Sequence, residues 1–167
     1  MKKRTVLIGL FVMLFLMSGC KSLTTGKVTV NVCDDLCQQE RDEYVQGINT
    51  FLAQAQVITS KIEYWKSVTK KDLGDITSLR DQVSDLKVPK DFELVHDYYS
   101  RAFGHYVEAV THVVTANDML SQASGSSNTQ LHNAELTKVV DNIQEARKIM
   151  VYADEEVKFA NNVIPKA

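Results

Sequence analysis

The sequence contains few of the residues that break or cross-link a chain. Its 167 residues include only 2 prolines, 7 glycines and 3 cysteines. Proline and glycine concentrate in turns, so their scarcity predicts long regular elements joined by few turns. Basic residues are not in excess either, because 19 Lys and Arg face 21 Asp and Glu. This balance gives no electrostatic basis for binding nucleic acid, and we expect no nucleic-acid partner.

Motifs that would name a reaction are also lacking. Cys33 and Cys37 are separated by three residues, which is not the Cys-x-x-Cys spacing of a thiol oxidoreductase. One Glu-x-x-His element runs from Glu93 to His96, whereas di-iron bundles use two such elements and two further carboxylates. These patterns predict a protein that is not an enzyme and that carries no cofactor.

The longest apolar run lies at the N-terminus. Residues 6–17 are apolar except for Gly9, and they follow a cationic start at residues 2–4 and precede Ser18 and Gly19. This is the order of regions in a secretory signal. Twelve residues span about 18 Å as a helix, which is short of the roughly 30 Å hydrocarbon core of a bilayer. A membrane-spanning anchor is therefore the weaker interpretation.

Cys20 directly follows Ser18 and Gly19, and the stretch "LFLMSGC" resembles the lipobox of bacterial lipoproteins. The resemblance implies that residues 1–19 are a cleaved lipoprotein signal and that Cys20 carries a diacylglycerol thioether. It also implies an extracytoplasmic protein anchored to the cell membrane or the outer membrane by its acyl chains, of which two or more anchor stably. The alternative is an ordinary signal peptide with an unrelated cysteine.

The chain after this signal would have 148 residues, from Cys20 to Ala167, with 16 basic and 21 acidic residues and a net charge of −5. That length suits one domain. The negative charge favours attachment by the lipid rather than by a basic patch. Residues 20–33 contain one strand-like alternation, with no second such run to pair with, so they are predicted to be an extended tether.

Cys33 and Cys37 remain once Cys20 is assigned to the lipid. An even number of cysteines in an exported protein permits a disulfide. We predict a local disulfide between Cys33 and Cys37, and two free thiols are the alternative. The loop that such a bond would close is too short to constrain much of the unfolded chain.

Residues 34–163 have a helical pattern throughout, followed by a tail at 164–167. Apolar residues recur every three or four positions, which places them in one stripe on each of four helices. The pattern predicts an all-α fold, an antiparallel four-helix bundle with three long helices and one shorter helix. The stripes are Tyr44, Ile48, Phe51, Ala55, Ile58, Ile62 and Trp65; Leu73, Ile76, Leu79, Val83 and Leu86; Phe92, Val95, Tyr99, Ala102, Tyr106, Ala109, Val113, Ala116 and Leu120; and Leu136, Val140, Ile143, Ala146, Met150, Ala153, Val157 and Ala160.

Local signals predict where these helices end. Thr69 with Asp72 resembles a capping box, Pro89 marks the boundary before the third helix, and the stretch "SQASGSSNTQ" predicts a loop. An alternative is that the first two helices form one rod bent at residues 67–72. Alanine recurs in the third and fourth stripes, which predicts a close approach of these two helices.

The stretch "LKVPKDFELVHDYYSRAF" resembles the junction between helices in small helical-bundle lipoproteins, chiefly of Gram-positive bacteria. The residues that carry the resemblance are Val88, Pro89, Asp91, Val95 and His96. It implies a helical bundle and an envelope location and no chemistry.

Two groups of side chains are candidate sites. His105, Glu108 and His112 lie on one side of the third helix and are weak candidates for metal ligands. Positions seven apart are about 10 Å apart along a helix, so one ion cannot take both histidines without a bend. Tyr64, Trp65 and Tyr98 form a candidate interaction surface, because Tyr and Trp are enriched at interface hot spots.

These observations predict a non-enzymatic interaction or ligand-binding module of the cell envelope. Its partners would be the membrane, through the lipid on Cys20, and another envelope protein. The alternative is a metal-binding or redox-active envelope protein that uses His105, Glu108 and His112, or Cys33 and Cys37.

Replacing the lipidated cysteine tests the predicted location. Cys20→Ala should release the protein from the membrane fraction, because the acyl chains supply the attachment. Cell fractionation with detergent phase partitioning measures the change, and Cys33→Ala, which leaves the lipidation site intact, is the control. Retention of the Cys20→Ala protein on the membrane as firmly as the unaltered protein would contradict lipid anchoring.

Overall fold

The computed structural model describes residues 35–124 and 129–164. Within these ranges the chain forms helices and no strand, which confirms the predicted all-α class. The predicted signal, the tether, Cys20 and Cys33 lie outside the described residues.

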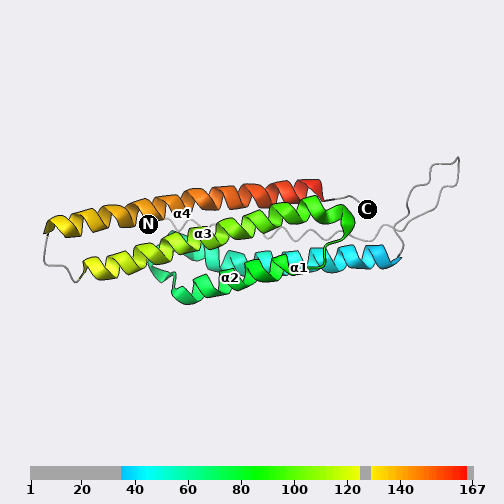
Figure 1. Cartoon of the computed structure of the whole chain (residues 1–167), viewed down its shortest axis with the longest axis horizontal. Helices are drawn as coiled ribbons and strands as arrows, with labels where there is room; N and C mark the ends of the chain where they lie inside the picture. The colour runs from blue at the N-terminus through cyan, green and yellow to red at the C-terminus, as the bar shows by residue number, and fades with distance from the viewer. Residues whose placement is uncertain (1–34, 125–128, 165–167) are drawn as a thin grey trace, which may run out of the picture. The chain divides into compact units, whose positions relative to one another are not determined.

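Four α-helices pack together, as Figure 1 shows. Two short 3₁₀ segments, η1 and η2, precede α2 and α3. The lengths of 25, 15, 31 and 35 residues confirm three long helices and one shorter helix. No helix among the described residues is both long and apolar enough to cross a membrane. The bounds are α1 Asp35–Thr59, η1 Ser60–Ser67, α2 Lys70–Ser84, η2 Lys90–Phe92, α3 Glu93–Ala123 and α4 Thr129–Val163.

The most extensive helix contact is between α3 and α4, and alanines line it. Alanine recurs at intervals of seven residues on both helices, and every one of these alanines is fully buried. A side chain of one carbon lets two helix backbones come close, toward the short end of the usual range of 8–10 Å. The predicted close approach is therefore observed. The alanines are Ala102, Ala109, Ala116 and Ala123 on α3, and Ala146, Ala153 and Ala160 on α4.

The buried face of α3 is wider than the single predicted stripe. Phe103, Val110 and Val114 are buried beside that stripe. The reason is that α3 packs against α4 along the alanines and also against α1, η1 and α2. A helix with neighbours on several sides needs a broader apolar surface than a helix with one neighbour.

One predicted core position of α4 is wrong. Val140 is 52% exposed, whereas its neighbour Val139 is buried, and Ile149 is buried more deeply than Met150. The alanines that face α3 set the rotation of α4 about its axis, and this rotation turns Val139 rather than Val140 toward the core. Periodicity alone fits both positions, because adjacent residues differ by only 100° around a helix.

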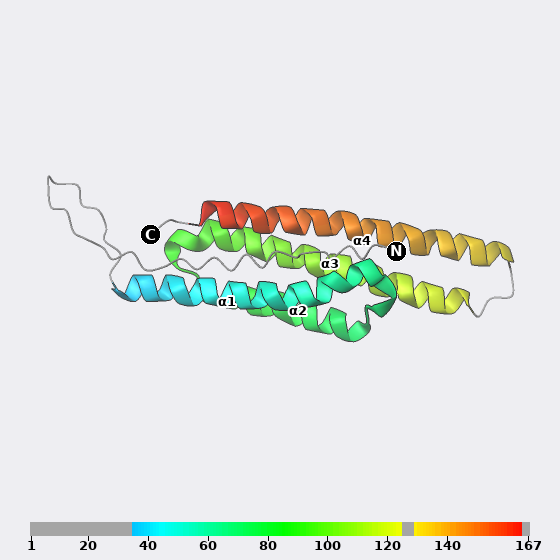
Figure 2. The same ribbon diagram turned by 180° about the vertical axis from the view of Figure 1, so that it is seen from behind.

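The beginnings of α1 and α3 and the end of α4 meet at one end of the bundle, which we call the entry end (Figures 1 and 2). The Tyr44 ring of α1 lies edge-on to Phe92 with ring centres 5.3 Å apart, and its hydroxyl is 3.2 Å from His96 Nδ1. The Tyr99 hydroxyl donates to Asn161 Oδ1 at 2.7 Å. Burial raises the pKa of Tyr99 to about 12, so this hydroxyl keeps its proton at neutral pH.

Enlarging a buried alanine tests the close approach of α3 and α4. Ala109→Leu and Ala153→Leu should each lower the free energy of unfolding by about 1–3 kcal/mol, because the larger side chain forces the helices apart. Ala53→Leu, at an exposed position of α1, is the control and should change stability by less than about 0.5 kcal/mol. Denaturant unfolding followed by circular dichroism measures the differences. Equal stability of all three variants would show that α3 and α4 are not closely packed there.

Candidate functional site

The chain reverses direction between α1 and α2 at a corner that we define as residues 60–69. The segment η1 is interrupted at Tyr64, whose backbone is not helical (φ −106°, ψ 51°), and Val68 is extended. Salt bridges between Arg41 and Asp91 and between Lys87 and Glu40 bring the chain after α2 back beside the beginning of α1. This return excludes the alternative of one bent rod.

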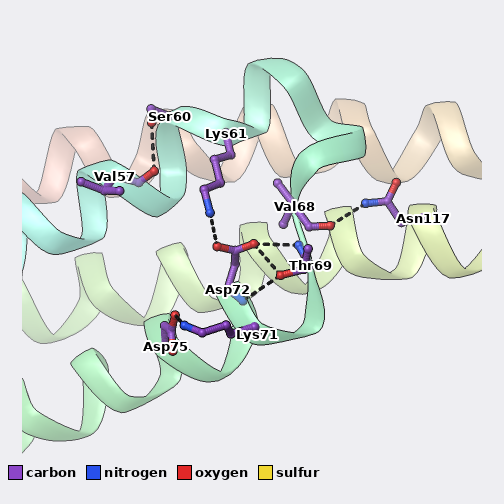
Figure 3. Close-up of polar contacts among 9 residues, drawn as sticks. All are labelled: Val57, Ser60, Lys61, Val68, Thr69, Lys71, Asp72, Asp75 and Asn117. Carbon is purple, nitrogen blue, oxygen red and sulfur yellow. Dashed lines mark hydrogen bonds and ion pairs between the residues drawn. The ribbon is translucent and has the colours of Figure 1, made fainter.

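Asp72 is the anchor of the corner, and only 5% of its surface is exposed. Its carboxylate accepts hydrogen bonds from the Thr69 amide at 2.8 Å and the Thr69 hydroxyl at 2.7 Å, and it forms a salt bridge with Lys61 (Figure 3). The Asp72 amide in turn donates to Thr69 Oγ1 at 3.3 Å. These reciprocal bonds confirm the predicted capping box at the start of α2.

The environment of Asp72 favours its charged form. Burial is the largest single effect and acts to raise its pKa, but the hydrogen bonds from Lys61 and Thr69 together outweigh burial and lower the pKa below its ordinary value. The carboxylate is therefore ionised at neutral pH. Its charge is balanced by Lys61, which comes from η1, so the pair joins the two sides of the corner.

Asn117 of α3 fastens the corner to the bundle. Its side-chain nitrogen donates to the carbonyl oxygens of Trp65 at 3.0 Å and Val68 at 2.9 Å, and Figure 3 shows the bond to Val68. The Val68 amide donates to Trp65 O at 3.1 Å, which closes the turn. Asn117 thus gives the Val68 carbonyl a donor and the Trp65 carbonyl a second one, in keeping with the need to pair buried backbone groups.

The corner presents two aromatic side chains. Tyr64 is 75% exposed, and Trp65 is half-buried with the Lys66 ammonium 5.5 Å from the centre of its ring. The backbone from Trp65 to Thr69 is held by the bonds from Asn117 and by the Asp72 cap, so little backbone freedom remains to be lost there on binding. Aromatic side chains on an ordered backbone are typical of interface hot spots.

The third residue of the predicted interaction surface lies elsewhere. Tyr98 precedes Asn117 by nineteen positions on α3, which is about 28 Å along the helix axis. Its ring stacks on Phe159 with ring centres 5.9 Å apart, and the Arg101 guanidinium lies 4.6 Å from the ring centre. Tyr64 and Trp65 therefore form one surface and Tyr98 belongs to another.

The structure places His105 beside Glu108 but pairs His112 with a residue of another helix. His105 Nδ1 lies 3.6 Å from Glu108 Oε2, but the His105 ring faces Tyr152, with ring centres 6.2 Å apart. His112 Nδ1 lies 2.9 Å from Asn142 Oδ1 instead. Among the described residues, no group of three or more His, Cys, Asp or Glu side chains is arranged to hold a metal ion.

Cys37 is disulfide-bonded. The other two cysteines of the chain, Cys20 and Cys33, lie outside the described residues. The pairing of Cys37 with Cys33 stays a prediction.

The sequence predicts part of the corner. The spacing of Thr69 and Asp72 predicts the cap, which is confirmed, whereas the interaction role of Tyr64 and Trp65 stays a prediction. Asn117 is not predicted, because an asparagine within a helix has no local signature and its two acceptors lie about fifty positions earlier in the chain.

Comparisons with known proteins gave no match. No family model, no curated protein and no solved structure matches this chain. Any function proposed for the chain therefore rests on its sequence and on the contacts, burial and charges of its described residues.

Removing the charge of Asp72 tests whether its carboxylate stabilises the corner. Asp72→Asn should lower the free energy of unfolding at pH 7 by about 2 kcal/mol, the usual worth of hydrogen bonds to a buried charge. Because folding lowers the pKa of Asp72, its contribution is present above the unfolded pKa of about 3.9 and is lost as the pH falls through the folded pKa. The difference between the two proteins should therefore shrink below about pH 4.

Urea unfolding at a series of pH values measures this difference. Asp75→Asn, which removes a carboxylate from an exposed pair with Lys71, is the control and should have little effect at any pH. A difference for Asp72→Asn that stays constant from pH 7 to pH 3 would contradict the assigned role of its charge.

Proposed function

We propose that this protein is an extracytoplasmic lipoprotein that acts as a non-enzymatic interaction module of the cell envelope. In this proposal an antiparallel four-helix bundle is held to a membrane by the lipid on Cys20 and the tether of residues 20–33. The corner at residues 60–69 binds another envelope protein. The observation that carries the proposal is the exposed Tyr64 on a corner that buried polar bonds hold in place.

Contacts between helices support the antiparallel arrangement. Tyr99, early in α3, bonds to Asn161, late in α4, and His112 in the middle of α3 lies beside Asn142 in the first half of α4. Early residues of α3 thus meet late residues of α4, as in an antiparallel pair with a short connection.

The disulfide at Cys37 supports a location outside the cytoplasm. Disulfides persist in oxidising compartments and are rare in the cytosol. A partner at Cys33 would leave Cys20 available for the lipid, as the proposal requires. Mass spectrometry of the unreduced protein would identify the pairing directly.

The position of the corner suits a partner away from the membrane. Phe92 at the entry end precedes Asn117, which holds the corner, by 25 positions on α3, or about 37 Å along the axis. The tether joins α1 at the entry end. A bundle anchored there would present Tyr64 and Trp65 at a distance from its point of attachment.

Photo-crosslinking in intact cells tests the proposed function. A photoreactive phenylalanine analogue at position 64 should capture one discrete neighbour, and the capture should be lost when Cys20→Ala removes the protein from the membrane. The matched control is the same analogue at Tyr152, another tyrosine with substantial exposure. Similar products from both positions, or none from position 64, would contradict a specific binding surface.

The captured neighbour then allows a binding measurement. Tyr64→Ser should weaken its affinity by tenfold or more, about 1.4 kcal/mol, and leave the stability of the bundle unchanged because the side chain is exposed.

Elemental analysis tests the alternative function: a stoichiometric metal in the purified protein that is lost in His105→Ala would contradict the proposal.

A further inference from the structure

A second apolar surface lies at the entry end, and we call it the entry patch: Leu94, Tyr98, Phe159 and Val163. Leu94 is 58% exposed and Phe159 is 54% exposed, and Tyr98 stacks on Phe159. Leu94 and Tyr98 are one turn apart on α3, as are Phe159 and Val163 on α4, so each pair shares a helix face. The four side chains therefore form one continuous patch across two helices.

The contact between α3 and α4 includes the Tyr98–Phe159 stack of this patch but extends well beyond it. Ala102 and Ala160 are fully buried nearby in the sequence, and the Tyr99 hydroxyl bonds to Asn161. Arg101 forms two hydrogen bonds of 3.1 Å to the carboxylate of Glu156 across the helices. Apolar side chains that stay exposed beside a satisfied interface commonly mark a surface that contacts something else.

The course of the chain indicates what the patch contacts. The residue Asp35 begins α1 at the entry end, where Arg41 pairs with Asp91 and Tyr44 contacts Phe92. Only fifteen positions separate Asp35 from Cys20, a span of at most about 50 Å when extended. An anchor on Cys20 would keep the patch that close to a bilayer, at an effective concentration at which weak contacts become populated.

We propose, resting on the proposed lipid anchor, that the entry patch docks the bundle on the lipid surface of the membrane that holds Cys20. Leu94, Tyr98 and Phe159 would lie at the level of the headgroups, where aromatic side chains are favoured. Leu36 in the first turn of α1, which is 72% exposed, would lie at the same surface. The tether then joins a bundle with a defined orientation, and the corner faces away from the bilayer.

The charges around the patch identify the lipid chemistry. Arg101, whose guanidinium lies over the Tyr98 ring, is paired with Glu156 and with Asp97. Lys158, which precedes Phe159 on α4, is a single exposed cation beside the patch. No unpaired cationic cluster among the described side chains of the patch would attract anionic headgroups. Docking therefore depends on apolar contact, and it should occur on zwitterionic lipid and persist at high salt.

Tryptophan fluorescence can show whether the corner or the entry patch lies close to the lipid. The chain has a single tryptophan, Trp65 at the corner, and the double variant Trp65→Phe, Phe159→Trp moves it to the entry patch. Each lipidated full chain is reconstituted into phosphatidylcholine vesicles that contain brominated phosphatidylcholine, which quenches only nearby tryptophan. Quenching should be several-fold stronger for the variant than for Trp65 in the unaltered chain.

Two further substitutions test whether the extra quenching depends on the entry patch itself. Leu94→Asp, added to the double variant, should abolish the extra quenching. Val140→Asp should not, because Val140 is comparably exposed but lies nineteen positions before Phe159 on α4, about 28 Å away along the helix. The quenching should be the same at 1 M salt and at low salt.

The remaining outcomes overturn the inference in distinguishable ways. Vesicles that float with the protein but quench neither tryptophan, or both equally, would show an anchored bundle that does not dock, and the proposed function would stand. Emission at position 159 that shifts with protein concentration and not with brominated lipid would assign the patch to a second copy of the chain. Protein that fails to float with the vesicles would overturn the lipid anchor as well.

Discussion

Asn117 of α3 donates two hydrogen bonds to the carbonyls of Trp65 and Val68, and these bonds tie the corner between α1 and α2 to the bundle. At this point η1 ends and α2 has not yet begun: the Trp65 carbonyl also accepts from the Val68 amide, and Asn117 supplies a side-chain donor to the Val68 carbonyl. Asp72 then begins α2 with a reciprocal cap and holds Lys61 from the other side. Polar bonds thus fix the corner to α3, and α1 and α2 on either side of it share one apolar core with α3.

Apolar contacts hold α3 and α4 together, and polar bonds hold the corner. The buried alanines bring α3 and α4 together along their length and need no polar partner. The corner and the entry end then differ: the corner, past which α3 and α4 continue (Figure 1), offers Tyr64 and Trp65 on a backbone held by polar bonds, and the entry end exposes Leu94 and Phe159. In the proposed function, the corner binds a partner and the entry patch contacts the membrane.

The helical class, the number of helices and most of the core follow from periodicity in the sequence. Every member of the first predicted stripe, from Tyr44 to Trp65, is buried or half-buried, and the Thr69–Asp72 cap follows from local spacing. Periodicity fails at Val140, because the rotation of α4 is set by its fit to α3. Periodicity also does not show that Tyr98 and Tyr64 belong to different surfaces, and it gives no sign of the role of Asn117. Both features depend on contacts between segments that are distant in the sequence.

Amide hydrogen exchange of Asn117→Ala, compared with the unaltered protein, tests the central claim most directly. Loss of the two donated bonds should speed exchange at Val68 and at the first amides of α2, while amides in the middle of α3 and α4 keep their protection, because the corner opens as a local unit. Unchanged exchange at Val68, or an equal loss of protection throughout the bundle, would show that Asn117 does not hold the corner.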